Sequence, residues 1–179
     1  MAAASVDSVG WGRRVENAMT LDRLEMSLDR FCAACQPYGL SLFRFITGLL
    51  LFQYGVAKIF KFPAVAMFAN PPPLIITAGA LELVLGALLM IGLFTRISAF
   101  ILSGEMAFAY FLGHMFKSGE PVFLPLINGG TAAILFCFAC LYLSVAGGGP
   151  LSVDAAAGES DRHRHSRHAH FSGARGMTR

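Results

Sequence analysis

Four long apolar stretches, separated by short segments rich in proline, glycine or charge, make up the middle of the chain. They cover residues 40–60, 73–94, 97–116 and 124–146. Each is close to the ~20 mainly apolar residues that a helix needs to cross the hydrocarbon core of a bilayer. Three prolines at 71–73 precede the second stretch, and Gly-Gly-Gly-Pro at 147–150 follows the fourth. Because such residues interrupt helices, the pattern predicts four separate membrane-spanning helices.

The three connections between these stretches, residues 61–72, 95–96 and 117–123, are short. We therefore expect an all-α integral membrane fold, in which consecutive helices run antiparallel in a compact four-helix bundle. Four spans place both chain ends on the same side of the membrane. Most arginines flank that side: Arg13, Arg14, Arg23, Arg30, Arg96, Arg162, Arg164, Arg167, Arg175 and Arg179. The opposite side has Lys58, Lys61 and Lys117, so the positive-inside rule predicts cytoplasmic termini.

The sequence divides into three segments around this membrane domain. Residues 1–38 form a predicted cytoplasmic N-terminal segment, residues 39–154 the four-span domain, and residues 155–179 a basic, His-rich tail that we expect to be disordered. Within the first segment, residues 19–35 predict an amphipathic helix that lies in the membrane interface. Its apolar side chains recur at helical spacing: Leu21, Leu24, Leu28, Phe31 and Cys35.

The composition favours a membrane protein over a soluble one. Of the 179 residues, 55% are apolar and 14% are charged, whereas soluble domains carry roughly 25% charged residues. The N-terminus lacks an apolar core followed by a small-residue cleavage site, so we expect no secretory signal peptide. The sequence also lacks a P-loop and any motif for reading nucleic acids. The lipid bilayer is therefore the predicted partner, and nucleic acid is not.

Four residues of the types Lys, Arg, Asp or Glu stand inside the predicted spans and are the candidate functional residues: Arg44, Lys58, Glu82 and Glu105. Ionisable side chains in hydrocarbon usually face the bundle interior or a wet cavity. At 1.5 Å per residue, both glutamates lie about 10–15 Å from a helix end. By depth, Glu105 is the nearest carboxylate to Arg44, and Glu82 is the one that Lys58 reaches.

Three interpretations of this intramembrane polar cluster remain open. The charges could form structural ion pairs that fix the register of the helices. They could instead line a polar pocket for a proton, a quinone head group or a small solute. In the third interpretation, Arg44 and Lys58 extend toward the two membrane surfaces.

The four cysteines form two C-x-x-C pairs with different surroundings. Cys137 and Cys140 lie inside the fourth apolar stretch, where packing is the expected role. Cys32 and Cys35 flank the membrane and are minor redox candidates, although the predicted cytoplasmic location is reducing. A four-cysteine zinc site would require Cys137 and Cys140 to leave their helix, and His114 has no second histidine in the membrane domain. We therefore predict no bound metal.

Five pieces of sequence, in order, resemble the DoxX family of small four-helix bacterial membrane proteins. They are the pattern from Arg44 to Lys58, "LELVLGALLMIGLFTR" at 81–96, "E-M-A-x-A-Y" at 105–110, Asn-Gly-Gly at 128–130 and "GGGPLSVD" at 147–154. The resemblance implies a four-helix bundle in a bacterial cytoplasmic (inner) membrane. Relatives include subunits of a thiosulfate-oxidising, quinone-reducing complex and membrane partners of oxidative-stress enzymes. Thr131 stands where the family commonly has Glu, so a role of that Glu does not carry over.

The leading functional hypothesis is an accessory or quinone-proximal subunit of a membrane oxidoreductase or oxidative-stress system. We expect no tightly bound cofactor of its own, with quinone as the ligand class to test. Its partners would be oxidoreductase subunits or further copies of the chain. The alternatives are a small-solute transporter or permeation protein that uses the same polar pocket, and a non-catalytic membrane scaffold.

Overall fold

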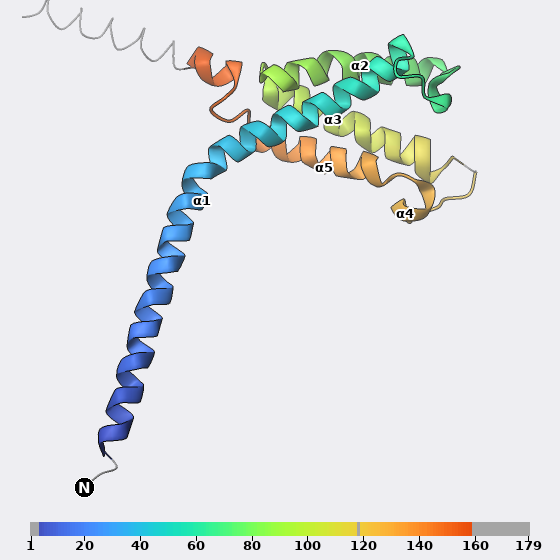
Figure 1. Ribbon diagram of the computed structural model, residues 1–179. Helices are drawn as coiled ribbons and strands as arrows, with labels where there is room; N and C mark the ends of the chain where they lie inside the picture. Colours follow the sequence, from blue (N-terminus) through green and yellow to red (C-terminus); the bar gives the residue numbers. More distant parts are fainter. Residues whose placement is uncertain (1–3, 118, 159–179) are drawn as a thin grey trace, which may run out of the picture. The chain divides into compact units, whose positions relative to one another are not determined.

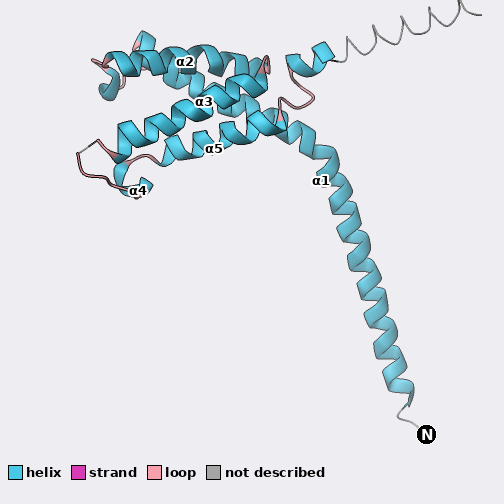
Figure 2. Ribbon diagram, turned by 180° about the vertical axis from the view of Figure 1, so that it is seen from behind, coloured by secondary structure: helices cyan, strands magenta, loops and turns pink. Residues whose placement is uncertain are grey.

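The computed structural model describes residues 4–117 and 119–158, in which all regular elements are helices and there is no β-strand (Figures 1 and 2). Its elements in chain order are α1 (Ala4–Phe60), the 3₁₀-helix η1 (Ala66–Phe68), α2 (Pro73–Ile91), α3 (Thr95–Tyr110), the π-helix η2 (Phe111–Met115), α4 (Pro125–Asn128) and α5 (Thr131–Ala146). The chain forms two compact units, Met1–Gly39 and Leu40–Arg179, which are described separately.

In the first unit, the predicted amphipathic segment is part of α1. The chain remains helical through Pro37 and into the membrane domain. Its apolar stripe is uncovered, because Leu21, Leu24, Leu28 and Phe31 are 55–67% exposed. The position of this stripe in a membrane interface stays a prediction.

The second unit begins with the last third of α1, which packs closely against α2 through glycines. A Cβ atom on Gly48 would lie 2.9 Å from the carbonyl oxygen of Gly86, and a Cβ on Gly55 would lie 2.7 Å from Cα of Leu83. Because position 48 faces 86 and position 55 faces 83, the two helices run in opposite directions. Small residues of this kind allow backbones to approach in a membrane, where the hydrophobic effect does not drive helices together.

Helix α3 packs against α5 on the other side of this unit. The Ser103 hydroxyl donates to the Cys137 carbonyl (2.9 Å), and the Arg96 guanidinium donates to the Ser144 carbonyl (3.2 Å). The contacts between these helices again pair early residues of one with late residues of the other, so they run in opposite directions. The buried apolar core is shared by the four helices: Leu51, Leu89, Ala99, Leu102, Met106, Cys140 and Leu143.

The fourth apolar stretch is interrupted, and the prediction of one continuous helix over 124–146 is wrong. Short α4 ends at Asn128, Gly129 adopts a left-handed conformation (φ 74°), and α5 begins at Thr131. The Asn128 side chain causes much of this break: it accepts from the Gly130 N–H and donates to the Val122 carbonyl, both at 2.7 Å. These bonds replace those of a continuing helix.

Among the described residues, three helical segments are long and apolar enough to cross a membrane: Leu21–Phe60, Pro73–Ile91 and Thr95–Met115. The fourth, Thr131–Ala146, is a shorter apolar helix of 16 residues. At 1.5 Å per residue it is about 24 Å long, somewhat less than the ~30 Å hydrocarbon core.

The predicted disordered tail begins within the described residues. The structure is helical over residues 153–158, so the first part of that prediction is wrong. Residues 159–179, which include the histidines of the tail, lie outside the described residues.

Candidate functional site

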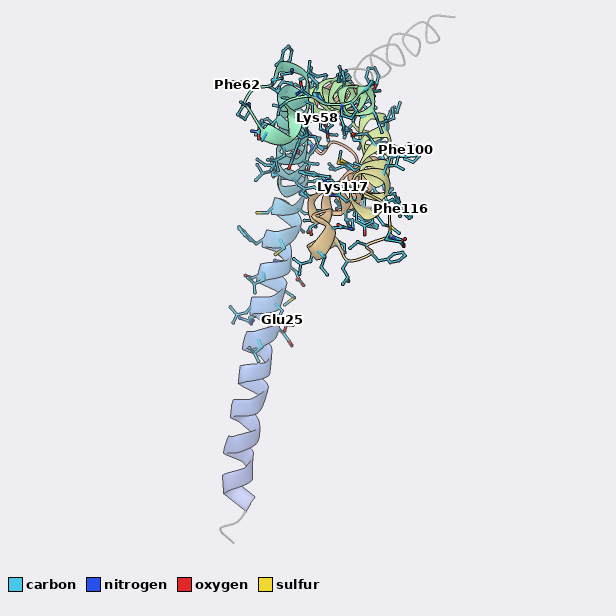
Figure 3. The ribbon with its side chains drawn as sticks, turned by 90° about the vertical axis from the view of Figure 1, so that its right-hand side faces the viewer. Glu25, Lys58, Phe62, Phe100, Phe116 and Lys117 are labelled. Carbon is cyan, nitrogen blue, oxygen red and sulfur yellow. The ribbon has the colours of Figure 1, made fainter. Side chains whose placement is uncertain are left out.

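The second unit buries several charged side chains beside its apolar core and exposes large apolar side chains on its outside. Arg44, Lys58 and Glu82 are 2%, 9% and 1% exposed. Large apolar side chains lie on the outer surfaces of α3 and α5, where Phe100, Phe108 and Leu135 are 66–69% exposed. Phe100 is labelled in Figure 3. This distribution is that of a helical unit surrounded by lipid.

Lys58 of α1 and Glu82 of α2 form a buried ion pair. The Lys58 ammonium Nζ lies 2.6 Å from Oε2 of Glu82, and the two side chains are 10% and 2% exposed. The sequence predicts this pairing. Gly79 makes it possible, because a side chain at position 79 would collide with Lys58, whose Cβ lies 2.7 Å from where a Cβ of residue 79 would stand.

Two aromatic rings flank the Lys58 ammonium. Nζ lies 5.9 Å from the centroid of the Tyr54 ring and 5.7 Å from that of Phe68. Aromatic faces attract cations, most strongly when water is excluded. Glu82, Tyr54 and Phe68 therefore hold the lysine charge inside the unit.

Glu105 of α3 is the third ionisable group of this cluster. Glu82 and Lys58 are its charged neighbours, so the predicted pairing with Arg44 is wrong. Both carboxyl oxygens of Glu105 are buried, and neither has a hydrogen-bond partner among the described residues. Burying an unpartnered polar group is costly. Glu105 is thus a position where a proton or a hydrogen-bonding ligand would be stabilised.

Arg44 is held elsewhere, at the other end of α1's membrane segment. Its guanidinium donates to four backbone carbonyls: Leu89 (2.5 Å), Met90 (2.6 Å), Gly148 (2.9 Å) and Leu151 (2.7 Å). Leu89 and Met90 lie in the last turn of α2, where the partial negative charge of the helix end favours a cation. Arg44 therefore ties α1 to the end of α2 and to the segment after α5.

Asp154 completes this end of the unit and was not a candidate from the sequence. Its carboxylate accepts from the backbone N–H groups of Phe94 and Thr95, both at 2.9 Å, and so caps the start of α3. Partial burial opposes ionisation of Asp154, but the hydrogen bonds from Thr95 and Phe94 and the charge of Arg44 outweigh it and lower its pKa. The sequence signal that could have pointed to Asp154 is its position in residues 147–154, the last of the five pieces that resemble the DoxX family.

A pocket of about 380 Å³ lies next to the ion pair, where α1 ends and α2 begins. Its lining residues are Lys58, Ile59, Lys61, Asn70, Pro71 and Ile76. Lys58 thus contributes both to the pocket wall and to the buried pair with Glu82.

Comparison with known proteins agrees with this architecture. The DoxX family model matches residues 39–115, a range that contains all four intramembrane ionisable residues. An "Uncharacterized protein" of Haemophilus influenzae is 38% identical over 122 residues, covering 66% of this chain and 90% of that protein. The chain belongs to the DoxX family. No solved structure matches it. With its long apolar helices, this DoxX chain is a membrane protein.

The remaining candidates do not join the DoxX polar cluster. Cys32 and Cys35 are free and exposed in the first unit, so redox chemistry there stays a prediction. Cys137 is half-buried and Cys140 buried, also as free thiols. Among the described residues, no group of three or more His, Cys, Asp or Glu side chains could hold a metal ion.

Two further positions lie near the break between α4 and α5. His114, in the π-helix η2, lies with Nδ1 3.1 Å from the Asn128 carbonyl oxygen. Thr131, where the family commonly has Glu, is exposed at the start of α5. Neither residue is among the charged neighbours of Glu105, which are Glu82 and Lys58.

Proposed function

We propose that this DoxX chain is an accessory, quinone-proximal subunit of a membrane oxidoreductase or oxidative-stress system. In this proposal its four apolar helices span the bacterial cytoplasmic membrane as an antiparallel bundle. Both termini are cytoplasmic, and the amphipathic part of α1 lies in the interface. The arginine distribution of the sequence supports this orientation.

The unpartnered Glu105 carboxyl group beside the Lys58–Glu82 pair carries the proposal. Reduction of a quinone to a quinol takes up two electrons and two protons. The chain would supply no electrons, so a partner oxidoreductase must deliver them. Glu105 suits the proton part of this chemistry, because a carboxyl group without internal hydrogen bonds can donate one to a quinone carbonyl and then transfer its proton.

The ion pair would set the electrostatics of this step. Loss of a proton from Glu105 leaves a second carboxylate near Glu82, and the Lys58 ammonium is the cation near both. A fixed cation stabilises charge most strongly where water is excluded. Lys58 would thus stabilise the ionised state of Glu105 until a second proton arrives.

The test replaces Glu105 by Gln, which preserves shape but cannot transfer a proton. Cells that lack the native protein would express either the wild type or Glu105→Gln, and the quinol fraction of the membrane quinone pool would be measured after rapid extraction. We expect a lower quinol fraction with Glu105→Gln. Ser103→Ala is the matched control on α3, since it removes a polar group that bonds only to α5.

Equal quinol fractions for the wild type and Glu105→Gln, at equal protein levels, would overturn the proposal. The pocket beside Lys58 gives the permeation alternative its support, because it opens next to the buried pair. Altered solute flux into vesicles containing purified Glu105→Gln, with a normal quinol fraction in cells, would favour that alternative. Unchanged behaviour in both assays would favour a scaffold.

A further inference from the structure

The pocket between the end of α1 and the start of α2 has an unbalanced positive charge. Two of its six lining residues are lysines and none is acidic. Lys58 is neutralised by Glu82, which lies behind the wall of the pocket. Lys61 is exposed, and no carboxylate among the described residues forms an ion pair with it. The pocket therefore has one uncompensated cation, together with the Asn70 amide as a neutral donor.

The start of α2 adds to this positive potential. Pro71 lines the pocket, and α2 begins two residues later and continues for 19 residues. The aligned peptide dipoles of a helix give its N-terminal end a partial positive charge, and here that charge comes from the dipoles themselves, because Pro72 and Pro73 have no N–H group. An anion in the pocket would thus be attracted by the lysine and by the helix end together.

The surface around the pocket is strongly apolar. Phe60, Phe62 and Leu74 are 65%, 73% and 63% exposed, and Ile76, which lines the pocket, is 46% exposed. Figure 3 shows Lys58 and Phe62 at this end of the helices. A free inorganic anion would leave these side chains uncovered. A lipid would cover them with an acyl chain while its head group contacts the polar residues of the pocket.

We propose that this pocket binds the phosphate head group of an anionic phospholipid. Lys61 is its main cation, Asn70 donates to a phosphate oxygen, and an acyl chain lies along Ile59 and Ile76. A zwitterionic head group fits less well, because its ammonium would need an acidic partner. The near carboxylate, Glu82, is already paired and only 2% exposed. Basic pockets between membrane helices bind anionic head groups in this way.

The experiment measures lipid binding by the full-length protein after purification and delipidation in a neutral detergent. Native mass spectrometry would follow titration with phosphatidylglycerol, phosphatidylethanolamine or inorganic phosphate. We expect phosphatidylglycerol to bind more tightly than phosphatidylethanolamine. Lys61→Gln should weaken the binding of phosphatidylglycerol about fivefold, which is equivalent to the ~1 kcal/mol that one lysine contributes near a lipid surface.

Lys117→Gln is the matched control. Lys117 is also exposed and lies at the same end of the helices, in the connection before α4, but it does not line the pocket (Figures 1 and 3). It should bind phosphatidylglycerol like the wild type. Asn70→Ala provides a second variant on another wall of the pocket and should also weaken binding.

Several outcomes would overturn the proposal. Equal losses in Lys61→Gln and Lys117→Gln would show a general charge effect instead of a site. Equal binding of the two phospholipids would remove the selectivity for an anionic head group. Binding of inorganic phosphate as tight as that of phosphatidylglycerol would make a free anion the ligand. None of these results depends on the quinone-linked function, which has its own measurement.

Discussion

Replacing Lys58 by Met should strongly destabilise the protein, because it leaves Glu82 buried without its cation. Met retains much of the length and volume of the lysine side chain, so packing changes little. Glu82 is 1% exposed, and Lys58 is its only ion-pair partner among the described residues. Removing one partner of a buried pair costs about 3–5 kcal/mol. Loss of the cation contacts with Tyr54 and Phe68 acts in the same direction.

The double variant Lys58→Met, Glu82→Leu separates the buried charge from other effects. Replacing both partners by apolar residues is often neutral, so the double variant should recover most of the lost stability. The free energy of unfolding would be measured by denaturant titration in mixed micelles, with circular dichroism as the signal. Lys61→Met, at an exposed lysine three residues away, should change it by less than about 0.5 kcal/mol.

A loss in Lys58→Met no larger than that in Lys61→Met would refute this reasoning. Failure of the double variant to recover stability would show that packing, and not an unpaired carboxylate, causes the loss. The double variant also bears on function. If it is stable and keeps a normal quinol fraction, the pair is purely structural and only Glu105 remains in the proposed chemistry.

Three further predictions concern other parts of the chain. Gly55→Ala should lower the free energy of unfolding by about 1–3 kcal/mol in the same titration, because the added methyl group would collide with Leu83. Gly104→Ala on α3 is the control, since an added Cβ there has nothing within 4 Å, and it should be neutral or slightly stabilising. Equal effects of the two substitutions would contradict the close packing of α1 against α2. Because the pKa of Asp154 is lowered in the folded protein, ionised Asp154 adds to the free energy of unfolding above the ordinary Asp pKa of about 3.9, and this contribution is lost as pH falls through the folded pKa. Asp154→Asn should flatten this dependence of stability on acid pH, and an unchanged pH profile would contradict the role of Asp154 as a cap. Maleimide should label exposed Cys32 and Cys35 quickly and buried Cys140 only after denaturation, as read by mass spectrometry of the digested protein; rapid labelling of Cys140 would contradict its burial.

The sequence predicts the helices and one of the polar contacts well. Apolar stretches of spanning length become the end of α1, α2, and α3 together with η2, because the number of apolar residues in a span is set by the thickness of the membrane and not by tertiary packing. The Lys58–Glu82 pair also follows from depth alone. Both residues lie on helices joined by a short connection, so a lysine near one end has few carboxylates within reach.

The depth of a residue in the membrane does not predict its partner where backbone groups compete with side chains. Arg44 was expected to meet Glu105, yet it binds carbonyls at the end of α2 and in the segment after α5. Every residue has a backbone carbonyl, so looking in the sequence for residues of opposite charge does not identify these acceptors. The break at Gly129 is similar, since an apolar count ignores the hydrogen bonds that the Asn128 side chain makes with its own backbone.

The way each buried charge is satisfied separates structural roles from a chemical one. Arg44 has four carbonyl acceptors, and Lys58 and Glu82 have each other. Such groups are held in place, and moving them would cost the contacts that offset their burial. Glu105 has no such contact among the described residues, although both of its oxygens are buried. A group with no internal bonds to lose can exchange a proton or accept a ligand at low cost, so Glu105 is the residue to which we assign the chemistry.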